Sequence, residues 1–324
     1  MTLSATFSPG FQQRSDLAVV VAADETYLPY AATPALALAG AGPGYDVLIG
    51  GPRPAALPQG LMAAGIGHVA ACDSALADSL PLDKRRSIAA YMTLFLGTAL
   101  NSRYRRILVL DADILYERGD IARLLASDIG GRAVAAVRDN RQWRTPRRKP
   151  KEFRKLREPA HPYFNSGVVL IDTQAFQEQD IPAQATRFAR QHHRLLSSHD
   201  QSLLNGILKG DWTEMSPLWN WQFTGASAHL TCMADPCLIH FIGKAKPWLD
   251  RSAGIVPMRM RDAFGRVLDQ HFPDAAQGTA PEQRHWPDAG HLRRALFRQW
   301  RAAGPMLRYL GRFPDPYTML DPRA

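Results

Sequence analysis

Residues 105–116 read Arg-Arg-Ile-Leu-Val-Leu-Asp-Ala-Asp-Ile-Leu-Tyr. The apolar run 107–110 predicts a strand buried on both faces, and we expect the strand to extend over 105–115. Asp111 and Asp113 follow the run, at the end of a strand where open α/β sheets bind ligands. Side chains two residues apart in an extended segment point the same way, so both carboxylates could bind one divalent cation. The alternative is a solvated loop with two turn-forming aspartates.

Two apolar segments before this stretch complete a parallel pattern. Residues 17–23 and 45–49 predict strands, and residues 27–39 between them predict a helix with Pro29 in its first turn. Strand, helix and strand at this spacing predict an α/β fold with a mostly parallel central sheet flanked by helices. The chain contains neither Gly-x-Gly-x-x-Gly nor the Gly-Lys-Ser/Thr of a P-loop.

Helices and strands continue to alternate through the rest of the chain. We expect helices at 87–100, 119–125, 176–196 and 199–206, and strands at 133–137 and 168–172. In residues 238–248 a last apolar strand breaks into a Gly and Pro loop that carries two lysines. Between Arg141 and Arg157 there are nine Lys or Arg residues. Such a run predicts a solvated, mobile loop, or a loop that also binds an anionic ligand or surface.

Composition describes an ordinary globular protein with a basic surface. The 324 residues are 46% hydrophobic and 21% charged, and the net charge of +9 favours anionic partners. No run approaches the roughly 20 apolar residues that span a bilayer, and residues 1–16 lack the pattern of a secretion signal, so we expect a cytoplasmic protein. The three cysteines are irregularly spaced and predict neither disulfides nor a zinc site.

Three polar positions stand at the predicted ends of elements. Asp24 either caps the helix that follows it or contacts a nucleotide, and Asp200 either caps a helix or lies at the rim of the same cleft. His240 precedes a loop with Gly243 and Lys246, where a glycine permits close backbone approach and a lysine suits a phosphate group.

Five motifs in order resemble the family 8 glycosyltransferases, which include glycogenin and the bacterial lipopolysaccharide galactosyl- and glucosyltransferases. The similarity covers roughly residues 17–248 and rests on Ala22-Ala23-Asp24, Asp111-Ala112-Asp113, Tyr163-Phe164-Asn165-Ser166-Gly167, His199-Asp200-Gln201 and His240-Phe241-x-Gly243-x-x-Lys246-Pro247-Trp248. The resemblance implies a GT-A fold and transfer of a hexose from a UDP-sugar, with retention of the anomeric configuration.

The resemblance also implies a metal site and a donor site. Asp111, Asp113 and His240 would bind Mn²⁺, with Mg²⁺ as the alternative, while Lys246 and the backbone around Gly243 would hold the diphosphate. The implied nucleotide-sugar-binding residues are Ala22, Asp24, Asp111, Ala112, Asp113, Asn165, Asp200, Gln201, His240, Gly243 and Lys246.

Asp200 and Gln201 are the implied catalytic residues. Asp200 either attacks the anomeric carbon in a double displacement, or acts with Gln201 to stabilise an oxocarbenium-like centre during front-face attack. One departure from the family stands nearby: Thr93 occupies a position that normally carries Arg, and Arg85 or Arg86 is the candidate substitute. Beside the uridine, Glu25 and Thr26 replace the usual Asp and Asn.

Residues 251–324 form a predicted basic extension to a catalytic domain over 1–250. Residues 291–317 interleave Arg with Leu, Phe and Trp, which is typical of an interfacial membrane segment, and several bacterial members of the family end in a similar tail. The alternative is a helix, split at Pro305, that packs its Leu and Trp face on the catalytic domain. A peripheral position on the inner face of the membrane would suit a lipid-linked acceptor.

The leading prediction is therefore a hexosyltransferase in lipopolysaccharide or other cell-surface glycan synthesis. The alternatives are transfer to a protein or small-molecule acceptor, and a non-catalytic nucleotide-sugar-binding homologue, which Thr93 keeps open. Nucleic acid is not an expected partner, because no DNA- or RNA-binding motif accompanies the basic run.

Overall fold

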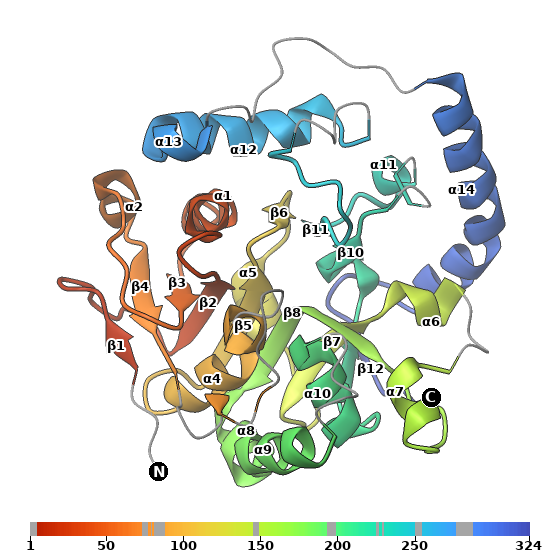
Figure 1. Ribbon diagram of the computed structural model, residues 1–324, viewed down its shortest axis with the longest axis horizontal. Helices are drawn as coiled ribbons and strands as arrows, with labels where there is room; N and C mark the ends of the chain where they lie inside the picture. The colour runs from red at the N-terminus through yellow and green to blue at the C-terminus, as the bar shows by residue number, and fades with distance from the viewer. Residues whose placement is uncertain are drawn as a thin grey trace.

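The computed structural model describes residues 5–72, 77–78, 80, 88–144, 149–192, 199–224, 227–228, 230–249, 255–276 and 288–324. Within these residues a nine-stranded sheet and a three-stranded sheet are surrounded by helices (Figure 1). The predicted α/β fold is confirmed.

The large sheet has the strand order β1-β4-β3-β2-β5-β8-β7-β9-β12. Neighbouring strands from β4 through β3 and β2 to β5 are parallel, whereas β8 is antiparallel to both β5 and β7. The carboxyl ends of β2 and β5 therefore meet the amino end of β8 at one edge of the sheet. The strands are β1 (Thr6–Phe7), β2 (Leu17–Ala22), β3 (Asp46–Gly51), β4 (Gly67–Ala70), β5 (Arg106–Asp111), β7 (Val134–Arg138), β8 (Phe164–Asp172), β9 (Thr213–Met215) and β12 (Met319–Leu320).

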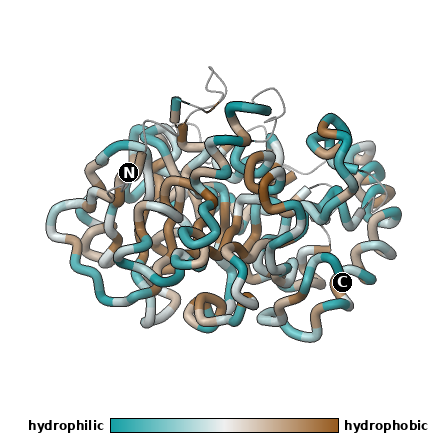
Figure 2. Tube along the Cα trace, turned by 90° about the horizontal axis from the view of Figure 1, so that it is seen from below, coloured by the Kyte–Doolittle hydropathy of each residue, from teal (hydrophilic) through white to brown (hydrophobic). Residues whose placement is uncertain are grey.

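Helices cover both faces of this sheet because its central strands are apolar on both sides. In β2, Val19 and Val21 pack in the cluster that contains α1 (Leu28–Ala39) and α5 (Ile121–Leu125), while Ala18 and Val20 pack in the opposite cluster. Figure 2 shows the hydrophobic segments gathered at the centre of the molecule. The opposite cluster contains α4 (Met92–Ala99), α8 (Thr173–Glu178), α9 (Ile181–His192) and α10 (His199–Leu208).

The expected strand over residues 105–115 is broken at its aspartates. β5 ends at Asp111, and β6 (Ile114–Tyr116) leaves the large sheet to join β10 (Trp221–Gln222) and β11 (Leu238–His240). In this small sheet His240 pairs with Ile114, so the turn that contains Asp113 lies beside the end of β11. The last apolar strand, which was expected to break into a Gly and Pro loop within residues 238–248, ends at His240.

Two other expectations are corrected by helix boundaries. The basic run 141–157 was expected to be a loop, but it contains the end of α6 (Asn140–Arg144) and all of α7 (Lys151–Lys155), which buries Phe153. The single helix expected over 176–196 is divided between α8 and α9, because Asp180 turns the chain with a φ of 53°. Residues 145–148 and 193–196 lie outside the described residues.

The helix expected over 87–100 begins with the 3₁₀ turn η1 (Ile88–Tyr91) and continues as α4. Residue 87 and the candidate substitutes Arg85 and Arg86 lie outside the described part of the chain. The remaining short elements are α2 (Gln59–Ala63), η3 (Pro217–Trp219) and α11 (Thr231–Ala234).

The extension after residue 250 packs on the rest of the molecule. In α12 (Met258–His271), Phe264 lies in one hydrophobic cluster with Phe241 and Trp248. The same helix lies next to α1 (Figure 1). α13 (Pro273–Ala276) and α14 (Ala289–Leu310) follow. The boundary between residues 250 and 251 falls on a segment outside the described residues, so the division into two domains stays a prediction.

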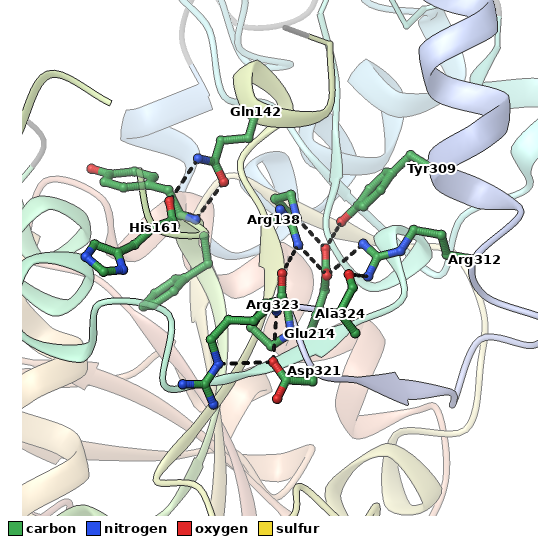
Figure 3. A network of polar contacts seen from close by, with 12 residues as sticks. Arg138, Gln142, His161, Glu214, Tyr309, Arg312, Asp321, Arg323 and Ala324 are labelled. Atoms are coloured by element: carbon green, nitrogen blue, oxygen red, sulfur yellow. Dashed lines mark hydrogen bonds and ion pairs between the residues drawn. The ribbon is translucent and has the colours of Figure 1, made fainter. Parts of the chain in front are cut away.

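A buried polar network attaches the end of α14 to the sheet (Figure 3). Glu214 on β9 is completely buried and accepts hydrogen bonds from Arg138 Nε (2.7 Å) and Nη2 (2.8 Å), Tyr309 Oη (2.9 Å) and Arg312 Nη1 (2.9 Å). Arg138 also donates to the carbonyl of Pro322 at 2.6 Å. The two cations compensate the desolvated carboxylate, so the C-terminal segment is tied to the central sheet.

α14 packs through a different face from the one expected. It runs unbroken through Pro305 and buries Ala295, Gln299, Ala302, Met306 and Tyr309. Its large apolar residues are exposed: Leu292, Leu296, Phe297, Trp300 and Leu307. A helix packed by its Leu and Trp face is thus contradicted. Among the described helices, none is both long enough and apolar enough to cross a bilayer.

Candidate functional site

A polar cleft of about 1090 Å³, part of it open to solvent, lies at the carboxyl ends of β2 and β5. It adjoins a hollow of about 610 Å³ that shares Asp111, Asp113 and Lys246 with it and adds Asp24 and Ala112. Every predicted nucleotide-sugar-binding residue except Gly243 lines one space or the other. This volume suits a ligand larger than a single sugar.

Asp111, Asp113 and His240 converge in the cleft. One ligand atom from each lies within 4.8 Å of the other two, although the residues come from β5, the following turn and β11. His240 Nε2 is 3.5 Å from Asp111 Oδ2 and 3.3 Å from Asp113 Oδ1. Two carboxylates and one imidazole form a donor set that suits Mn²⁺ or a similar cation.

A chain of hydrogen bonds fixes which nitrogen of His240 faces the aspartates. Asn165 Oδ1 accepts from the Gly167 N–H (3.1 Å) and from Asn220 Nδ2 (2.8 Å), so Asn220 Oδ1 is the atom directed at His240 Nδ1 (3.0 Å). That oxygen only accepts, hence Nδ1 carries a hydrogen and Nε2 is the nitrogen that faces both carboxylates. A metal ion could be bound by Nε2 and by both carboxylates at once, which is the fit that a metal site requires.

Gly167 leaves the space that the His240 ring occupies. A Cβ at this position would lie 2.1 Å from His240 Cε1 and 2.8 Å from Asp111 Oδ2, far inside van der Waals contact. Any side chain on residue 167 would therefore displace two of the three candidate ligands without being a ligand itself.

Lys246 lies against the same group. Its ammonium donates to Asp113 Oδ2 and to the carbonyl of Phe241, the latter at 2.5 Å. Burial by itself raises the pKa of Asp113, but His240 and Lys246 outweigh burial and hold that pKa well below its usual range. Asp113 is thus kept as the carboxylate, the form that binds a cation.

Asp200 faces the cleft from the first turn of α10. Thr93 Oγ1 donates to its Oδ2 at 2.8 Å, and Ser166 Oγ donates to its Oδ1 at 2.9 Å. Burial, followed by the negative charge of Asp111, raises the pKa of Asp200 to about 7. Thr93, at the position where the family normally has Arg, therefore contacts the predicted catalytic carboxylate with a hydroxyl in place of a guanidinium.

Gln201 forms the wall beside Asp200. Its Oε1 accepts from Asn165 Nδ2 at 3.1 Å and from the Ser166 N–H at 3.3 Å, and its Nε2 donates to Asp139 Oδ2 at 3.2 Å. These bonds hold the amide in one orientation between β8 and the end of β7.

Asp24 has the capping contact that its sequence position predicted. Its Oδ1 accepts from the Tyr27 N–H at 3.0 Å, at the start of α1. The carboxylate also lines the hollow beside the cleft, so the structure is compatible with both roles.

Sequence reasoning missed the residues that hold the others in place. Asn220 orients His240, Ser166 and Thr93 orient Asp200, and Asp139 holds Gln201. Asn220 and Asp139 carry no motif, because each acts through a partner distant in the sequence. Ser166 lies within one of the family motifs and Thr93 departs from the family pattern, so the sequence did contain a signal at those two positions.

Comparison with known proteins identifies relatives over about half of the chain. The model of glycosyl transferase family 8 matches residues 68–252, which is more than half of the chain. General stress protein A of Bacillus subtilis (strain 168) is 32% identical over 44% of this chain and 53% of its own length. Lipopolysaccharide 1,2-glucosyltransferase of Escherichia coli (strain K12) is 29% identical over 52% of each. The chain thus spans about half the length of these curated relatives.

A solved structure shows the same fold. The galactosyltransferase LgtC, in complex with donor and acceptor sugar analogues, superimposes with a TM-score of 0.61 at 22% identity. The match covers 82% of this chain and 98% of that one.

Proposed function

Because this chain belongs to glycosyltransferase family 8, we propose that it transfers a hexose from a UDP-sugar to a glycan acceptor with retention of the anomeric configuration. The observation that carries the proposal is the placement of Asp111, Asp113 and His240 in one cleft with Asp200 and Gln201. A cation-binding group on one side and a carboxylate and amide on the other suit a diphosphate joined to a sugar.

The metal-binding group and Lys246 would serve the leaving group. Breaking the bond between sugar and diphosphate leaves negative charge on UDP, and Mn²⁺ held by Asp111, Asp113 and His240 would stabilise that charge. Mg²⁺ is the alternative, but the imidazole in the donor set favours Mn²⁺. The Lys246 ammonium would contact the diphosphate, so no strong general acid is needed there.

For the sugar, front-face attack is supported better than double displacement. Both oxygens of Asp200 accept hydrogen bonds, from Thr93 and Ser166, which lowers their nucleophilicity. Asp200 and Gln201 would stabilise positive charge at the anomeric carbon, while the leaving phosphate accepts the proton of the acceptor hydroxyl. A covalent glycosyl adduct on Asp200, detected by mass spectrometry with a slowly reacting fluorinated donor, would overturn this choice.

The decisive assay measures UDP release with Mn²⁺ and individual UDP-sugars. We expect Asp111→Asn and Asp113→Asn to lower kcat/KM by on the order of 100-fold, or about 3 kcal/mol. The control is Asp16→Asn, which removes an exposed carboxylate that pairs with Arg105. Full turnover in both cleft variants would refute the metal site. Binding of a UDP-sugar with no UDP release would instead identify a non-catalytic binder.

We further propose that the acceptor belongs to a bacterial cell-surface glycan. The support is the E. coli relative, which is a lipopolysaccharide glucosyltransferase by name. A protein or a small molecule remains the alternative acceptor, and the same UDP-release assay separates the three classes when each is supplied in turn.

Peripheral membrane contact through α14 is part of this proposal. Leu296, Phe297, Trp300 and Leu307 are more than half exposed on a helix that also carries exposed Arg residues, as interfacial helices do. We expect Phe297→Ser with Trp300→Ser to abolish binding to anionic vesicles, with Met233→Ser as the control for an exposed apolar residue elsewhere. Unchanged vesicle binding would exclude this face.

A further inference from the structure

A second pocket lies next to the cleft, and Gln201 is the residue that lines both. The second pocket, here named the basic pocket, has about 690 Å³ of space including that open to solvent. The Gln201 amide directs its oxygen to Asn165 in the cleft and its nitrogen to Asp139 in the basic pocket. One fixed side chain thus lines both spaces.

Cations outnumber carboxylates around the basic pocket. Arg141, Lys149, Lys151 and Arg154 line it, against Asp139 and Glu152. Both carboxylates already accept hydrogen bonds within the protein. Glu152 is buried and accepts from Ser202 Oγ at 2.7 Å, and Asp139 accepts from Gln201 and from the Arg141 N–H at 2.9 Å.

The cations of the basic pocket are more exposed than its other charged and aromatic groups. Arg141, Lys151 and Arg154 are exposed, while Glu152 and Tyr163 are buried. A hollow with positive groups at its rim concentrates the field and attracts a negative ligand.

Resting on the proposed function, we propose that the basic pocket binds an anionic group of the acceptor, a phosphate or a carboxylate. The donor diphosphate is served in the cleft by the metal-binding group and Lys246, on the other side of Gln201. The acceptor is the remaining molecule whose hydroxyl must approach the donor sugar at Gln201. Its neighbouring charged group then lies among Arg141, Lys151 and Arg154. The acceptor class is therefore an anionic glycan.

The test compares binding of three probes by calorimetry in the presence of UDP: a methyl hexoside, its 6-phosphate and the corresponding uronic acid. We expect an anionic probe to bind at least about tenfold more tightly than the neutral one, with the difference shrinking at high salt. The more tightly bound of the two anionic probes identifies the group, phosphate or carboxylate, that the pocket prefers. Equal affinity for all three probes would overturn the proposal.

The variant pair is matched for charge. The double variant Lys151→Gln with Arg154→Gln should weaken binding of the anionic probe about tenfold. The control double variant, Lys155→Gln with Arg190→Gln, removes two exposed cations that do not line the pocket and should leave the affinity for the probe unchanged. Equal losses in the two double variants would refute a specific site. Thermal midpoints within about 2 °C of one another establish that all variants fold.

Further outcomes separate this proposal from others. If the pocket variant loses affinity for UDP, the basic pocket serves the donor and the proposal is wrong. If it loses binding to anionic vesicles but keeps the sugar phosphate, the pocket is a membrane contact and the proposal is again wrong. Absence of UDP release by the wild-type protein would refute the proposed function, whereas calorimetry reads the anion site independently of turnover.

Discussion

Replacing Arg138 by Met tests whether the buried network at Glu214 holds the C-terminal segment to the sheet. Glu214 has no exposed surface and receives two of its four hydrogen bonds from Arg138. Removing one partner of a buried ion pair costs about 3–5 kcal/mol, because the remaining charge stays desolvated. Arg312 still faces Glu214, so we expect the lower end, about 3 kcal/mol of unfolding free energy.

The measurement is equilibrium unfolding in urea, followed by tryptophan fluorescence. The double variant Arg138→Met with Glu214→Leu should lose less stability than Arg138→Met alone, because it removes the uncompensated charge together with its partner. The control is Arg323→Met, which breaks ion pairs that are half exposed and should cost at most about 1 kcal/mol. A loss below about 1 kcal/mol for Arg138→Met, or a double variant less stable than the single, would refute the reasoning.

Further predictions concern the cleft. Gly167→Ala should abolish Mn²⁺ binding in calorimetry, because the new Cβ displaces His240 and Asp111. Gly304→Ala should not, because its Cβ would make only an ordinary contact with the Arg308 side chain at 3.7 Å. In metal-free protein the pKa of Asp200 is about 7 in the folded state and near 3.8 in the unfolded state. Between these two pH values the folded state therefore binds more protons than the unfolded state. The contribution of Asp200 to stability accordingly falls as the pH rises from about 4 to about 7. The unfolding free energy of wild type relative to Asp200→Asn should accordingly drop by about 2–4 kcal/mol between pH 4 and 8, and a constant difference would contradict the shift. Thr93→Val removes a hydrogen bond that lowers the pKa of Asp200, so the acid limb of the pH profile of kcat should move to higher pH. Thr93→Ser keeps a hydroxyl and should restore the wild-type profile. An acid limb that does not move in Thr93→Val would show that Thr93 does not act through Asp200.

Local patterns predicted the central strands of the sheet well, because the apolar pattern of a strand is contained in neighbouring residues. The run 107–110 is apolar on both faces and lies in the middle of the sheet, and the segment 17–23 pairs beside it. The convergence of Asp111, Asp113 and His240 was expected only through the motif order that the chain shares with its family. No local signal relates residues 113 and 240, since their proximity depends on β6 leaving one sheet for another.

Predictions that depended on tertiary partners were less successful. The basic run 141–157 was expected to be a loop, but Phe153 finds a buried position and stabilises a short helix there. For α14 the alternative prediction, a helix that packs its Leu and Trp face on the catalytic domain, was wrong, because the buried face consists of Ala, Gln, Met and Tyr. Tyr309 is buried because Glu214 offers it a hydrogen bond, which composition alone does not reveal.

The contact between Lys246 and Asp113 gives the metal-free site its own positive charge. We expect a divalent ion that binds both oxygens of Asp113 to displace this ammonium, which then becomes available for the diphosphate of the proposed nucleotide donor. Loading of the ion and of the nucleotide should therefore reinforce one another. In Lys246→Met the ion alone should bind more tightly than in wild type, yet UDP should no longer strengthen its binding.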